Sequence, residues 1–197
     1  MTPQLQTQLA ELEAFGEHND SEHQERPKRM LNITRDTGEF LSVLVKATQA
    51  KHILEIGTSN GYSTLWLADA AQQTNGHVTT VEYAEYKIAL AAKNFSRAGL
   101  SSQITQRHCD AGALLAETAA SSVDLLFLDS ERSEYVGWWP AIKRVLKPHA
   151  LLVVDNATSH AADMAPFMAL VQNDGDFSTS LVPVGNGEFL AVKQVAQ

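Results

Sequence analysis

The feature that most constrains the fold is a regular alternation of short apolar runs with longer segments of helical periodicity. Two of the runs, residues 125–129 (LLFLD) and 151–155 (LLVVD), are apolar at every position before a terminal aspartate. Strands of this kind are buried on both faces, as in a parallel sheet that helices cover. The alternation therefore predicts an α/β fold with a Rossmann-like, doubly wound sheet.

The expected elements follow this rhythm along the chain. We predict strands at residues 52–56, 77–81, 103–107, 123–129, 150–155, 177–184 and 188–192. Between and before them we predict helices at residues 3–15, 36–48, 63–72, 85–98, 111–119, 135–146 and 161–172. The last two strands are joined by Gly185-Asn186-Gly187, a hairpin signal. The prediction is thus a mostly parallel seven-stranded sheet with a C-terminal antiparallel hairpin and helices on both faces.

We expect a single globular domain in two parts, an N-terminal helix with a connector (residues 1–35) and the main α/β unit (residues 36–197). Gly16 is expected to end the first helix. The polar stretch that follows, residues 17–29, is typical of a mobile connector or lid.

Composition and charge narrow the partners. Hydrophobic residues make up 44% of the chain, and no apolar run approaches the roughly 18 residues that a membrane span needs. The acidic, amphipathic N-terminus is no signal peptide, and the single cysteine, Cys109, fits a reducing compartment, so we expect a cytoplasmic protein without membrane partners. The net charge of −8 argues against nucleic acid and for a small-molecule partner. The sequence leaves open whether the chain forms a homodimer.

The end of the first predicted strand carries a cofactor-site pattern. Gly57 and Gly61 allow a tight turn and a close backbone approach to a ligand. Glu82 ends the second predicted strand, where a carboxylate can accept hydrogen bonds from both hydroxyls of an adenosine ribose. Ligands of open α/β sheets bind at this carboxyl edge.

Two cofactors share this layout, a dinucleotide and S-adenosylmethionine (SAM). A dinucleotide requires G-x-G-x-x-G for its pyrophosphate, whereas this chain has G-x-x-x-G with Ser59 in place of the middle glycine. The carboxylate of Glu55 would repel a pyrophosphate but could hold the ammonium group of SAM. The pattern therefore favours SAM over NAD.

Five segments together resemble the catechol O-methyltransferase-like group of class I methyltransferases. These are residues 53–68 (ILEIGTSNGYSTLWLA), Glu82, residues 109–111, residues 126–129 and residues 153–156. The resemblance covers roughly residues 30–193 and implies SAM-dependent O-methylation of a small molecule. It implies SAM contacts from Glu55, Gly57, Ser63, Glu82 and Asp110, and a divalent-metal site of Asp129, Asp155 and Asn156. We also expect the cofactor site to include Thr58, Ser59, Gly61, Tyr83, Ala111 and Asp129.

The chain departs from this family at two places. Arg132 stands where the family commonly has a lysine, three residues after the first metal aspartate. The family's catechol enzymes also place a glutamate shortly before the last hairpin, in a region that residues 177–180 (FSTS) occupy here. The first departure leaves the identity of the general base open, and the second leaves open whether catechol is the acceptor.

The chemistry of Asp129, Asp155 and Asn156 also favours a metal site. Asp129 ends one predicted strand and Asp155-Asn156 ends its neighbour, so two carboxylates and one amide oxygen meet at the edge where Gly57 lies. Hard oxygen ligands of this kind suit Mg²⁺, which can lower the pKa of an acceptor hydroxyl. A strand-end carboxylate that only caps a helix is the simpler alternative.

The candidates for catalysis are Arg132 and His160. Arg132 keeps its proton at any physiological pH and cannot act as a base. It could pair with a substrate carboxylate or with Glu131, and a solvated surface charge is the alternative. His160 follows Asp155 by five residues and is a candidate to take the proton of the acceptor. Trp138 and Trp139 fit packing better than substrate contact.

Three other functions remain open. They are a metal-independent small-molecule methyltransferase, a non-catalytic SAM-binding module and an NAD-type oxidoreductase. The sequence does not identify the acceptor.

Overall fold

The chain alternates strands and helices from its second helix onward, as the apolar pattern predicts. The computed structural model describes residues 1–195, so the last two residues of the expected 36–197 unit lie outside the described residues. The strands are β1 (His52–Ile56), β2 (His77–Glu82), β3 (Ile104–His108), β4 (Val123–Leu128), β5 (Leu146–Val154), β6 (Phe177–Val182) and β7 (Glu188–Lys193). The helices are α1 (Pro3–Glu22), α2 (Arg35–Ala47), α3 (Tyr62–Thr74), α4 (Glu85–Ala98), α5 (Ala111–Glu117), α6 (Tyr135–Val145) and α7 (Ala161–Gln172).

The seven strands form one sheet in the order β3-β2-β1-β4-β5-β7-β6. Strands β1 to β5 pair in parallel, whereas β7 is antiparallel to both of its neighbours. The predicted doubly wound sheet with a terminal antiparallel hairpin is therefore confirmed. Strand order reverses between β1 and β4, so a ligand site is expected at the carboxyl ends of these two strands.

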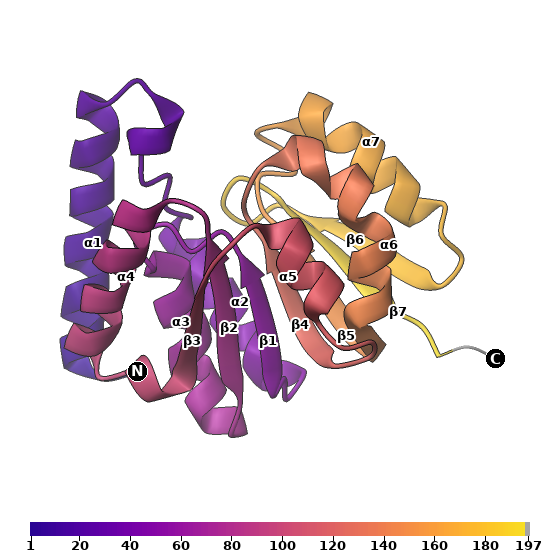
Figure 1. Ribbon diagram of the computed structural model, residues 1–197, viewed down its shortest axis with the longest axis horizontal. Coiled ribbons are helices and arrows are strands. Elements are labelled where there is room, and N and C mark those ends of the chain that lie inside the picture. Colours follow the sequence, from indigo (N-terminus) through magenta and orange to yellow (C-terminus); the bar gives the residue numbers. More distant parts are fainter. Residues whose placement is uncertain (196–197) are drawn as a thin grey trace.

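Helices cover both faces of the sheet (Figure 1). On one face, apolar side chains of α1 to α4 form a buried cluster with the sheet, whose members include Leu9, Leu41 and Leu67. On the other face, α5, α6 and α7 pack through residues that include Leu115 and Phe167. Each central strand contributes side chains to both clusters, which explains why its sequence is apolar at successive positions.

The first helix is longer than predicted. Gly16 was expected to end it, but α1 continues to Glu22, and that prediction is wrong. Gly16 is buried, and a Cβ there would lie 2.5 Å from the side-chain nitrogen of Asn32, whose amide donates to the backbone oxygen of Leu12. A tertiary contact thus offsets the low helix propensity of glycine. The connector that remains contains a short 3₁₀ helix at Arg26–Lys28.

None of the helices in the described part of the chain combines the length and the apolar character that crossing a bilayer requires.

Candidate active site at the carboxyl edge of the sheet

The turn after β1 needs glycine at its first position. Gly57 has a φ of 113°, and a Cβ there would lie 2.0 Å from the backbone oxygen of Asp129. Gly61 also has a positive φ and is the N-cap residue immediately before α3. The turn therefore brings the backbone between β1 and α3 directly against the end of β4.

Glu82 lies at the end of β2 and holds this turn. Its carboxylate accepts hydrogen bonds from the backbone N–H groups of Ser59, Tyr83 and Ala84, each at 2.9 Å. A carboxylate has about four lone-pair sites, so capacity for further donors remains. Glu82 thus joins the β1 and β2 ends and still faces the adjoining cavity.

Glu55 lies behind the turn and not on the cavity wall. It is fully buried and accepts hydrogen bonds from the hydroxyls of Ser63, Thr64 and Thr80, two of them at 2.6 Å. Burial raises the pKa of Glu55 to about 7. A direct contact between this carboxylate and a ligand ammonium would need these hydroxyl partners to move, whereas Ser63 itself lines the cavity.

A cavity of about 480 Å³ opens at the carboxyl edge of the sheet. Its volume lies within the range of roughly 300–1,000 Å³ that small-molecule sites occupy. The predicted cofactor residues that line it are Gly57, Thr58, Ser59, Ser63, Glu82, Tyr83, Asp110, Ala111 and Asp129. They come from the ends of β1, β2 and β4 and from the segment after β3, so elements far apart in sequence build one site.

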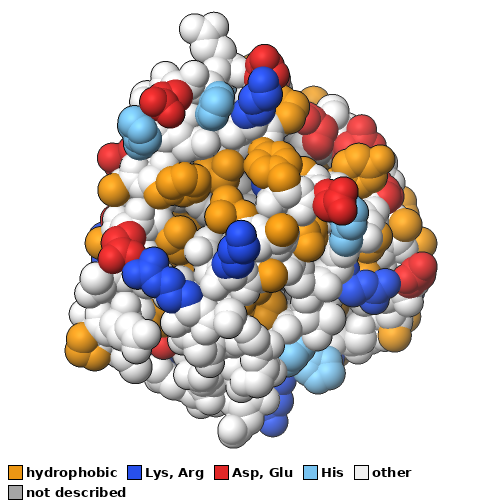
Figure 2. All heavy atoms as spheres, turned by 60° about the vertical axis from the view of Figure 1, so that its left-hand side comes forward, with side chains coloured by type: hydrophobic (Ala, Val, Ile, Leu, Met, Phe, Trp, Pro, Cys, Tyr) orange, Lys and Arg blue, Asp and Glu red, His pale blue; other side chains and the backbone are white. Residues whose placement is uncertain are grey.

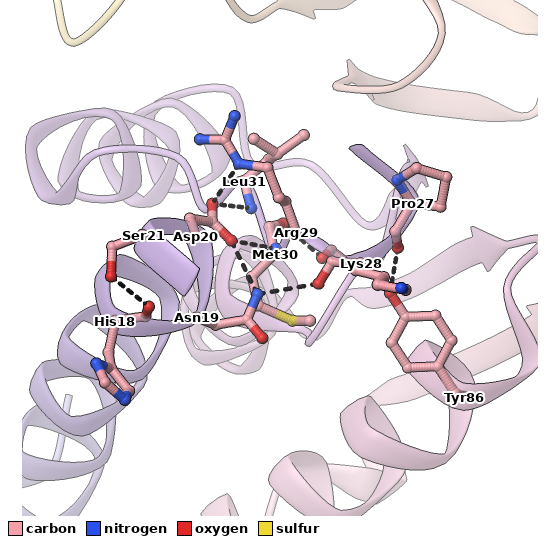
Figure 3. A network of polar contacts seen from close by, with 11 residues as sticks. His18, Asn19, Asp20, Ser21, Pro27, Lys28, Arg29, Met30, Leu31 and Tyr86 are labelled. Carbon is pink, nitrogen blue, oxygen red and sulfur yellow. Dashed lines mark hydrogen bonds and ion pairs between the residues drawn. The ribbon is translucent and has the colours of Figure 1, made fainter. Parts of the chain in front are cut away.

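The connector between α1 and α2 closes one side of this cavity. Asp20, near the end of α1, accepts hydrogen bonds from the backbone N–H groups of Met30 (2.6 Å) and Leu31 (2.9 Å), as Figure 3 shows. The hydroxyl of Tyr86 in α4 donates to the backbone oxygen of Pro27, and that of Ser59 donates to the backbone oxygen of Met30. The connector is therefore tied to α1, to α4 and to the β1 turn.

Several wall residues were not predicted from the sequence. Arg26, Met30 and Lys87 line the cavity, as does Trp138, which the helical pattern had assigned to packing. Trp139 is buried against Phe177, in agreement with packing. Figure 2 shows hydrophobic side chains gathered across the middle of the face on which α1 and α4 lie, with charged side chains around them. No local motif marks these wall residues, because only the folded chain brings them together.

The three predicted metal ligands meet beside the cavity. Asp129 follows β4, and its backbone N–H donates to the backbone oxygen of Ile56 at 3.0 Å. The backbone N–H of Asp155 donates to the backbone oxygen of Leu128 at 3.1 Å, so β1, β4 and β5 end side by side. The Asn156 amide nitrogen donates to Asp155 Oδ2 at 2.6 Å and to Asp129 Oδ1 at 3.4 Å. Among the three, Asp129 is the one that lines the cavity.

Electrostatics disfavours two charged carboxylates at this place. Burial raises the pKa of Asp129 well above its usual range, and the nearby charges of Asp155 and Glu55 add to the effect. Burial also raises the pKa of Asp155. Neighbouring carboxylates repel each other unless a proton or a cation intervenes.

The donor set fits a hard divalent cation. It consists of two carboxylates and an amide, and within residues 1–195 no N–H or O–H group donates to the buried Oδ1 of Asp155. Oxygen ligands of this kind are those that Mg²⁺ and Ca²⁺ prefer. Over the same residues, no group of three or more His, Cys, Asp or Glu side chains is placed to hold a metal ion.

The two residues proposed for catalysis lie outside the cavity wall. Arg132 is 8% exposed, and its positive charge opposes the rise in the pKa values of Asp129 and Asp155. His160 is exposed, and its Nδ1 lies 3.0 Å from the hydroxyl of Ser159. The wall beside Asp129 carries Glu131 and Glu134 instead.

Comparisons with known proteins agree with this geometry. The sequence profile of a family described as O-methyltransferase matches residues 6–194. A catechol O-methyltransferase of Niastella koreensis is 38% identical over 129 residues, which are 64% of this chain and 58% of that protein. The chain therefore covers less than two thirds of that relative's length.

Two solved structures share the fold. The cofactor-bound Rv0187 from MTB has a TM-score of 0.80 at 25% identity, over 100% of this chain and 92% of that one. The O-methyltransferase TomG from Streptomyces achromogenes, in complex with SAM, has a TM-score of 0.78 at 24% identity, over 99% of this chain and 91% of that one.

Proposed function

Since this chain belongs to the O-methyltransferase family, we propose that it transfers the methyl group of SAM to a hydroxyl oxygen of a small-molecule acceptor, assisted by a divalent cation. The observation that carries the proposal is the convergence on one cavity of the Gly57 turn, Glu82 and Asp129. The turn and Glu82 suit the binding of a nucleoside. Asp129 adds to the same cavity a carboxyl group that could bind a cation.

The cavity residues have separate roles in this proposal. Glu82 accepts hydrogen bonds from the ribose hydroxyls, and the backbone at Gly57 lies against the amino-acid part of SAM. The segment at Asp110 faces the adenine. In the reaction the carbon–sulfur bond of the sulfonium breaks, its electron pair stays on sulfur, and a carbon–oxygen bond forms at the acceptor. The protein's main contribution is to hold donor and acceptor in line.

Asp129, Asp155 and Asn156 are the residues that would hold the cation. When bound, such an ion lowers the pKa of an acceptor hydroxyl. The support for this part is the oxygen donor set, the mutual repulsion of the two carboxylates and the buried Asp155 Oδ1. Glu131 and Glu134 are the wall carboxylates available to take the hydroxyl proton.

Methyl transfer measured with labelled SAM and a panel of hydroxyl acceptors, in Mg²⁺ and in EDTA, tests the proposal. We expect turnover in Mg²⁺ and its loss in EDTA, with SAM binding largely retained, because the cation serves the acceptor. Undiminished turnover in EDTA would remove the cation from the mechanism.

One observation favours a metal-independent methyltransferase as the second candidate. Arg132 is buried beside the acidic pair and supplies a positive charge there without any ion. In that case the wild type keeps its full methyl-transfer activity in EDTA, and the Arg132→Met variant loses this activity.

A further inference from the structure

The N-terminal helix reaches the Gly57 turn (residues 57–61), although the sequence assigned it to a different part of the chain. Helix α1 lies beside α4 at one side of the molecule (Figure 1) and contacts α3 as well. Its Glu13 accepts a hydrogen bond from the hydroxyl of Tyr62, the first residue of α3. Tyr62 is 1% exposed and lines the cavity. A side chain of α1 therefore contacts the wall of the proposed SAM site.

Arg35 holds the carboxylate of Glu13 in place. Its Nη2 lies 2.9 Å from Glu13 Oε1 and 3.1 Å from Oε2, and its Nε donates to Oε2 at 3.3 Å. A guanidinium that contacts both oxygens fixes the orientation of a carboxylate. Arg35 begins α2 directly after the connector, several residues of which line the cavity. One carboxylate thus joins the end of the connector to the start of α3.

A second set of hydrogen bonds ties α1 to the same turn. The buried side chain of Gln8 donates to the backbone oxygen of Asn94 in α4 at 2.9 Å. The side chain of Asn94 donates in turn to the backbone oxygen of Asn60 at 2.8 Å. Asn60 lies within the turn, and its Oδ1 accepts the backbone N–H of Tyr62 at 3.1 Å. Both routes from α1 therefore end at residues 60–62.

The contact between Tyr62 and Glu13 has a fixed direction. Burial raises the pKa of Tyr62, so the phenol keeps its proton and acts as the donor. A hydrogen bond to a charged acceptor contributes more than one between neutral groups. A buried hydroxyl without an acceptor costs free energy, so without Glu13 the start of α3 is expected to shift. The turn would shift with it, because Tyr62 follows Gly61 directly.

We propose that Glu13 is a positioning residue for cofactor binding, which holds the hydroxyl of Tyr62 and thereby fixes the turn that contacts SAM. The inference rests on the proposed use of SAM. It assigns Glu13 no contact with the cofactor, and it makes cofactor affinity depend on an acceptor oxygen at position 13. A role confined to the docking of α1 would change stability alone.

Substitutions at position 13 separate the two roles. Glu13→Gln keeps an acceptor oxygen for the Tyr62 hydroxyl, whereas Glu13→Ala removes it. Tyr62→Phe removes the donor at the other end of the same hydrogen bond. Glu17→Ala, one turn further along α1 at an exposed position, is the matched control. Leu5→Ala, at a buried position of α1, weakens the packing of the helix and leaves this hydrogen bond in place.

Calorimetric titration of each full-length variant with S-adenosylhomocysteine measures affinity, and urea denaturation measures stability separately. We expect Glu13→Ala and Tyr62→Phe to bind about 5- to 30-fold more weakly than the wild type. The variant with both substitutions should bind no more weakly than either single variant, because both remove the same contact. Glu13→Gln and Glu17→Ala should bind as the wild type does. Leu5→Ala should lose stability and keep its affinity.

Each other result overturns the inference. Equal affinities in all variants would make Glu13 a residue that only docks α1. A loss in Glu13→Gln as large as that in Glu13→Ala would show that the charge matters and not the acceptor oxygen. Additive losses in the double variant, or an equal loss in Leu5→Ala, would show that the hydrogen bond is not the cause. A wild type that binds no S-adenosylhomocysteine refutes the proposed use of SAM itself, which is distinguishable because no variant then has affinity to lose.

Discussion

The carboxylate of Glu82 has two tasks in this structure, because it accepts three backbone N–H groups before any ligand is bound. It shapes the Gly57 turn through Ser59, and it presents oxygen atoms to the cavity. Residues of this type link the stability of a turn to the affinity of the site that the turn forms.

Glu82→Ala should weaken SAM binding by about 1–3 kcal/mol, the usual effect of losing a hydrogen-bonding carboxylate. Titration calorimetry on the folded variant measures the change. Glu85→Ala, three residues further on at an exposed position, is the control and should bind SAM as the wild type does. An unchanged affinity in Glu82→Ala would remove the ribose assignment.

Glu55 makes stability depend on pH in a defined direction. Burial raises its folded-state pKa from 4.5 to about 7, so between these values the folded chain retains a proton that the unfolded chain has lost. The free energy of unfolding therefore falls as the pH rises from about 4.5 to about 7 and stays low above that.

Glu55→Gln has no such proton and should lack this component. The wild type should lose up to about 3 kcal/mol relative to Glu55→Gln across that pH window, because one pKa unit corresponds to about 1.36 kcal/mol. Urea denaturation of both proteins at pH 4.5, 6 and 8 measures the difference. A difference that does not vary with pH would show that Glu55 is not protonated in the folded chain.

At the scale of elements, the connector between α1 and α2 is the part whose hydrogen exchange a bound ligand should change most. It contributes Arg26, Met30 and other wall residues, and its backbone is held by Asp20 (Figure 3). A lid role stays a prediction that the contacts support, since the connector already borders the cavity.

Hydrogen exchange of residues 26–33 should slow when S-adenosylhomocysteine is added, because the ligand packs against these backbone groups. Asp20→Ala should speed exchange there without ligand, since the N–H groups of Met30 and Leu31 lose their acceptor. Glu22→Ala, at an exposed position of the same helix, should leave exchange unchanged. Equal exchange with and without ligand would make the connector a simple linker.

The elements themselves were largely predictable, because hydrophobic periodicity is a local property. The sheet and its hairpin follow from that pattern, and so does the alignment of Asp129 with Asp155. Gly16 was misjudged because its neighbour Asn32 comes from outside the helix. The register of β5 with β7, which pairs Val154 with Phe189, was not predicted for the same reason, since non-local contacts set it.

At the scale of the whole molecule, the sheet order decides where chemistry can occur. Strand order reverses between β1 and β4, and helices cover both faces of the sheet, so the ligand site lies at the carboxyl ends of these strands. The Gly57 turn, Glu82 and Asp129 therefore line the same cavity. The central claim is that this cavity binds SAM.

Calorimetric titration of the full-length protein with SAM and, separately, with NAD tests that claim most directly. The G-x-x-x-G spacing after β1 favours a cofactor without a pyrophosphate. We therefore predict saturable binding of one SAM per chain and no binding of NAD. Binding of NAD without binding of SAM would contradict the account.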